Sequence, residues 1–84
     1  VSKIAERTGI SGQTQGIAIK IIHEAKRKRA ASGKDPMGLA AAALYIACIS
    51  NGENKSQKDI SIASGVTEVT IRNRCAGLRK ILDT

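Results

Sequence analysis

The chain has 84 residues, which is enough for one domain with a single modest core. Its net charge of +7 and its pI near 9.9 favour a polyanionic partner. With one tyrosine and no phenylalanine or tryptophan, the composition argues against recognition by base stacking and favours duplex DNA over single strands or RNA.

The first part of the chain predicts two helices. Residues 1–9 place their apolar side chains on one helical face, and Gly9 is expected to end that helix. Because the chain begins at Val1 and not at methionine, we expect it to be a piece of a longer protein. Ser11 can cap a second helix, and this helix has an apolar stripe formed by Ile17, Ala18, Ile21, Ile22 and Ala25. Its basic end, residues 26–29, is expected to lie in solvent.

A third, central helix is predicted after a break near residue 33. Asp35 can cap this helix, and Pro36 suits its first position. No charged residue occurs from Leu39 to Ile49, and the alanines in this run allow close approach on every side, so we expect this helix to sit at the centre with the others packed around it. The run is too short to cross about 30 Å of hydrocarbon. Residues 51–54 are expected to form a solvent loop.

Residues 56–82 have the pattern of a helix-turn-helix. Ser56 and Asp59 can form a capping box at the start of the first helix. Gly65 tolerates the left-handed backbone of a tight turn, and Thr67 can cap the next helix. That last helix has a stripe of residues expected in the core, which are Ile71, Cys75, Leu78 and Leu82. It also has an outward set that can reach a major groove, which consists of Glu68, Val69, Arg72 and Asn73.

No segment alternates as a strand does, so the sequence predicts an all-α domain of five helices with a buried third helix. Cys48 and Cys75 have only His23 as a possible co-ligand, so no zinc site is expected and both thiols are predicted to be reduced and buried. No catalytic set and no phosphate-cradling glycine loop is present, and we therefore predict neither enzymatic activity nor a cofactor.

Two segments closely resemble the second cyclin-like repeat of transcription factor IIB, above all its archaeal form. They are the alanine-rich run at 33–47, which opens with Gly-Lys-Asp-Pro, and the Gly-Val-Thr-Glu-Val-Thr-Ile-Arg-Asn-Arg run at 65–74. The likeness extends over the whole chain. It implies that residues 1–84 form one cyclin-like repeat, whose helix-turn-helix at 56–82 reads the B recognition element just upstream of a TATA box.

Site residues are carried over from the resemblance position by position. Val69 and Arg72 match the family's principal base-contacting positions, and Thr70 is a further contact. Arginine can present a bidentate fork to guanine, and valine can contact a thymine methyl group. Residues at helix starts and loops are expected to hold phosphates; these are Lys34, Lys55, Ser56, Gln57 and Lys58.

The resemblance also implies the partners, which are double-stranded promoter DNA, TATA-binding protein and, through parts of the protein outside this chain, RNA polymerase. No membrane partner is expected, and the chain should bind as one unit because no dimerisation helix is present. An archaeal protein would act in the cytoplasm at the nucleoid, and a eukaryotic one in the nucleus.

Two features leave room for other interpretations. The family usually has an aromatic residue at the position of Cys75, and Gly77 lowers helix propensity, so the last helix is expected to pack less firmly. Arg74, Arg79, Lys80 and the cluster at 26–29 can equally be solvated helix ends. The alternative function is a cyclin-type scaffold that binds proteins through its basic surface and reads no bases.

Overall fold

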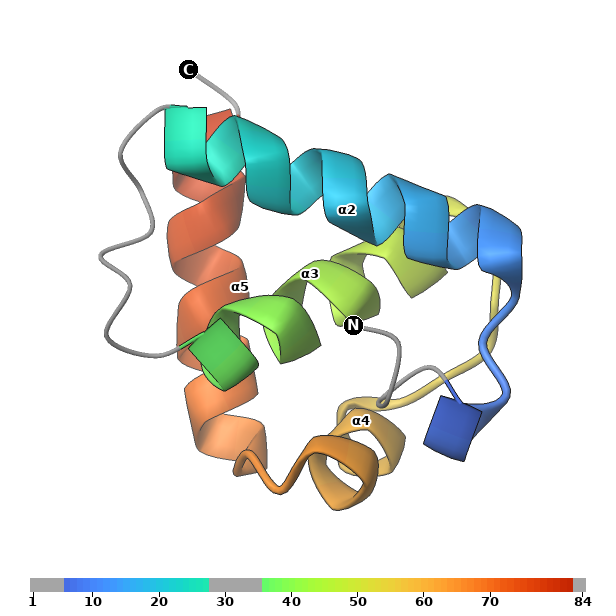
Figure 1. Ribbon diagram of the computed structural model, residues 1–84. Helices are drawn as coiled ribbons and strands as arrows, with labels where there is room; N and C mark the ends of the chain where they lie inside the picture. The colour runs from blue at the N-terminus through green and yellow to red at the C-terminus, as the bar shows by residue number, and fades with distance from the viewer. Residues whose placement is uncertain (1–5, 28–35, 83–84) are drawn as a thin grey trace.

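The computed structural model describes residues 6–27 and 36–82, which form an all-α domain (Figure 1). Residues 6–8 are helical and are followed by α2 (Gly12–Arg27), α3 (Pro36–Ser50), α4 (Gln57–Ser64) and α5 (Glu68–Leu82). No strand occurs within these two ranges. The predicted all-α fold is confirmed. The expected Asp35 cap and residues 28–29 lie outside the described residues.

The centre of the domain is α3, as predicted, and it is contacted by α2, α4 and α5. Ala41, Leu44 and Ala47 are fully buried, and Leu44 is among the largest side chains with no exposure. Alanines on several faces of α3 let the neighbouring helices approach closely. Exposure rises toward the two ends of the helix, where Met37 is 45% exposed and Ile49 is 51% exposed.

The second helix, α2, begins and packs as its sequence predicts. The Thr14 N–H donates to Ser11 Oγ at 3.2 Å, which is the expected capping bond. Ala18 and Ala25 have no exposure, and the isoleucines of the predicted stripe pack against the core. Thr14 is also fully buried, which the apolar pattern did not predict.

A polar cluster joins the loop after α3 to the start of α2. The Asn51 side-chain amide donates to Thr14 Oγ1 at 2.8 Å, and the hydroxyls of Ser11 and Thr14 donate to the Glu53 carboxylate. The expectation of a plain solvent loop was therefore wrong for Asn51 and Glu53, which are both half-buried. Their partners lie 37 to 42 residues away along the chain, so no local pattern could reveal them.

The Glu53→Gln variant should make folding stability less sensitive to acid. Hydrogen bonds from Ser11 and Thr14 lower the pKa of Glu53, so its stabilising effect is present above the unfolded pKa and is lost as pH falls through the folded pKa. Urea midpoints at about pH 7 and about pH 3 measure the change, which should be smaller in the variant than in the unmodified chain. Equal changes in both proteins would show that the cluster contributes nothing through the charge of Glu53.

Both cysteines are free and buried, as predicted. Burial raises the pKa of the Cys48 and Cys75 thiols, which keeps them protonated and unreactive. The Cys75 thiol lies 3.6 Å from the Ala42 carbonyl oxygen. This small pair lets α5 approach the backbone of α3 closely, so α5 remains anchored without an aromatic side chain at this position.

Candidate nucleic-acid interface

The unit formed by α4, a short turn and α5 has the predicted caps. The Ser56 N–H donates to Asp59 Oδ2, and the Asp59 N–H donates to Ser56 Oγ, both at 3.1 Å, which completes the capping box. Gly65 ends α4 with φ of +76°, and its N–H donates to the Ser61 carbonyl oxygen at 2.9 Å. A side chain in this left-handed conformation would be strained, so glycine is the residue that permits the turn.

The start of α5 is equally well defined. The Thr70 N–H donates to Thr67 Oγ1 at 3.2 Å, which is the expected capping bond. Val66 packs partly buried against the core and so holds the turn down. Glu68 is the first residue of α5, where its negative charge interacts favourably with the positive end of the helix dipole. Caps on both sides of the turn therefore set where each helix ends and begins.

The two faces of α5 differ sharply in burial. Ile71 is fully buried, and Cys75 and Leu78 are nearly so, all on the face that packs against α3. The predicted outward set, Glu68, Val69, Arg72 and Asn73, is exposed. Val69 is 60% exposed, so its apolar side chain gains little from folding. Thr70 is half-buried, and its hydroxyl accepts a hydrogen bond from Thr67, so this side chain serves the cap as well as any contact.

The residues expected to hold phosphates differ in accessibility. Lys58 and Ser56 are exposed, whereas Lys55 and Gln57 are half-buried, and Lys34 lies outside the described residues. Hydrogen bonds from Ser56 lower the pKa of Asp59, and Lys55 and Lys58 add to this effect. Asp59 is therefore ionised at neutral pH, and its carboxylate sits at the start of α4.

This carboxylate changes how α4 could hold DNA. The sequence suggested that backbone N–H groups at the helix start would bind phosphate, but the N–H groups of Ser56 and Asp59 already have partners within the capping box. A phosphate placed there would also be repelled by Asp59. The ammonium groups of Lys55 and Lys58 remain suited to a phosphate at greater reach.

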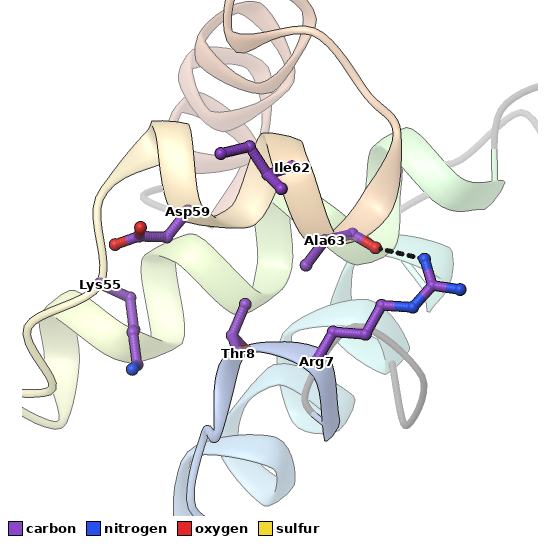
Figure 2. Close-up of a pocket in the computed structure, with 6 residues that line it drawn as sticks. All are labelled: Arg7, Thr8, Lys55, Asp59, Ile62 and Ala63. Carbon is purple, nitrogen blue, oxygen red and sulfur yellow. Dashed lines mark hydrogen bonds between the residues drawn. The ribbon is translucent and has the colours of Figure 1, made fainter.

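One residue of this region was missed by the sequence analysis. A surface groove of about 330 Å³ lies between the first helical segment and α4; it is lined by Arg7, Thr8, Lys55, Asp59, Ile62 and Ala63 (Figure 2). On one side of it, Arg7 Nη1 donates to the Ala63 carbonyl oxygen at 2.9 Å. Arg7 stands two residues before Gly9, and nothing in its local sequence signals a contact with α4.

In the part of the chain that the structure describes, no group of three or more histidine, cysteine or acidic side chains could hold a metal ion. Among the same residues, no helix has the length and apolar character needed to span a bilayer.

Comparison with known proteins points to one family. The family model for the transcription factor TFIIB repeat matches residues 1–81. The transcription initiation factor IIB of Pyrobaculum islandicum is 51% identical over 83 residues, covering 99% of this chain and 25% of the relative. That of Sulfurisphaera tokodaii is 53% identical over 74 residues, covering 88% of the chain and 24% of the relative. The chain therefore spans about a quarter of the length of these relatives.

Proposed function

Because the chain belongs to the transcription factor TFIIB repeat family, we propose that it reads duplex DNA just upstream of a TATA box, at the B recognition element. Its relatives are named transcription initiation factor IIB, which supports a role in general transcription initiation. Members of this family are transcription factors, and the chain is not an enzyme.

The observation that carries this proposal is the exposed start of α5. Val69 and Arg72 are both exposed to solvent and lie about one helical turn apart, while Ile71 is buried in the core. A guanidinium held on a rigid, capped helix can form a bidentate contact with guanine, and the valine beside it can contact a thymine methyl group. Asn73 and Glu68 flank this pair and complete the proposed reading surface.

Two protein partners are also proposed. We place TATA-binding protein beside this domain on the promoter, and RNA polymerase on segments of the longer relatives that this chain does not span. The chain would act where the DNA is, at the nucleoid of an archaeal cell. A single helix-turn-helix makes few contacts, so the chain alone should bind weakly and gain affinity when TATA-binding protein is present.

A titration with two duplexes tests the proposal. One duplex carries a promoter from the B recognition element through the TATA box, and the other has the upstream bases scrambled with the TATA box kept. We expect the chain with TATA-binding protein to prefer the first duplex, and we expect only micromolar binding without that protein.

Three results would contradict parts of this proposal. Equal binding to both duplexes would remove base readout and favour the protein-binding scaffold. An unchanged affinity on adding TATA-binding protein would remove that partner. Nanomolar binding by the chain alone would show that it does not share its hold on DNA with other domains.

Lys58→Ala should weaken binding to both duplexes equally, because an ammonium on a phosphate carries no sequence information. The slope of log affinity against log salt should fall by about one. Titrations at several salt concentrations measure this slope. Lys20→Ala is the matched control, since Lys20 is an exposed residue of α2. That helix lies on the other side of α3 from α4 (Figure 1). If both variants have the same slope, Lys58 does not contact phosphate.

A further inference from the structure

The short helix α4 has few buried side chains to hold its C-terminal end in place. The helix has eight residues, and only Ile60 and Ala63 are buried. The carbonyl groups of the last helical turn lack N–H partners within the helix. The Gly65 N–H satisfies the Ser61 carbonyl, and the other carbonyls need donors from outside the helix. A donor that reaches these carbonyls can therefore help to hold the end of α4 in place.

Arg7 supplies one of them from the other end of the chain. Its Nη1 donates to the Ala63 carbonyl oxygen at 2.9 Å, although the two residues are 56 positions apart (Figure 2). A positive group at the C-terminal end of a helix is favoured by the helix dipole. The contact therefore joins charge and hydrogen bonding at one carbonyl.

The place of this contact matters for the reading unit. Ala63 lies two residues before Gly65, where the chain leaves α4. The following helix, α5, is anchored separately through Ile71 and Cys75 against α3. Arg7 is therefore bonded to the helix that precedes the turn, whereas α5 is anchored to α3 by its own side chains.

We infer that Arg7 is a positioning residue for DNA reading, which sets α4 relative to α5 without touching the DNA bases. A helix-turn-helix needs its first helix over the DNA backbone while its second helix lies in the groove. Arg7 would keep Lys58 on α4 in register with Arg72 on α5. This inference rests on the function proposed above.

Hydrogen exchange without DNA tests the positioning itself. Arg7→Gln should speed exchange at the Gly65 and Val66 amides about three- to tenfold, while the Leu44 amide in α3 is unchanged. The control is Arg27→Gln, which removes the same charge from a surface pair with Glu24 on α2 and should leave all of these amides unchanged. Arg7→Lys keeps the charge and should restore part of the protection. Unchanged exchange at Gly65 and Val66 in Arg7→Gln, or equal acceleration at Leu44, would overturn the inference.

Duplex binding tests the consequence for reading. With TATA-binding protein present, Arg7→Gln should lower the ratio of promoter to scrambled affinity about three- to tenfold, whereas Arg27→Gln should leave the ratio unchanged. Equal losses on both duplexes would make Arg7 an ordinary phosphate contact and overturn its positioning role. If the unmodified chain shows no preference, the proposed function fails, and the exchange data alone then decide whether Arg7 holds α4.

Discussion

Replacing Arg72 by alanine is expected to cost about 1 to 3 kcal/mol of binding free energy on the promoter duplex and much less on the scrambled one. The expected loss on the promoter duplex corresponds to about 5- to 150-fold in affinity. Arg72 is exposed on the solvent face of α5, so its removal should leave the fold intact. Competition titrations with both duplexes, in the presence of TATA-binding protein, measure the two losses side by side.

Arg72→Lys is the control that separates charge from reading. Lysine keeps the positive charge, so the salt dependence of binding should stay the same. It lacks the planar fork that makes two hydrogen bonds to guanine, so most of the sequence preference should disappear. A lysine variant with full preference would show that Arg72 acts only as a charge. Equal losses on both duplexes for Arg72→Ala would lead to the same conclusion.

Ile71→Ala should instead lower the stability of the fold, although Ile71 is next to Arg72 in the sequence. Ile71 has no exposure and joins α5 to the core, so its truncation should lower the free energy of unfolding by about 2 to 5 kcal/mol. That is a large part of the total stability of a domain of this size. Urea unfolding followed by circular dichroism measures the loss as a shift in midpoint at constant slope.

A milder variant makes the contrast with Arg72 quantitative. Ile71→Val removes one methylene group and should cost about 0.5 to 1.5 kcal/mol of stability. Under conditions where this variant is folded, its ratio of promoter to scrambled affinity should match that of the unmodified chain. A ratio that falls with each methylene removed would show that packing under α5 and base reading are coupled.

Local chemistry made much of this domain predictable from its sequence. Ser56 and Asp59 predict the start of α4, and Gly65 predicts its end. All three residues have the predicted conformations and hydrogen bonds. The spacing of Ile71, Cys75 and Leu78 indicated which face of α5 is buried. Each of these signals acts within a few residues, so a linear sequence contains it in full.

The features that were not predicted depend on contacts between distant residues. Glu53 looked like a loop residue, yet it accepts hydrogen bonds from Ser11 and Thr14 at the start of α2. No role was predicted for Arg7, yet it donates to the Ala63 carbonyl oxygen. Both side chains are polar and near glycine residues, a context typical of solvent-exposed turns. Only the packing of α2 and α4 around α3 brings their partners within reach.

The separation of the two faces of α5 has an evolutionary consequence. Substitutions at Val69 and Arg72 fall on exposed positions, where changes usually alter folding free energy by only about 0.5 kcal/mol. Under the proposed function, duplicated genes that share this scaffold could therefore diverge in the promoters they serve while their products remain equally stable. New base preferences would then arise without a greater risk of misfolding.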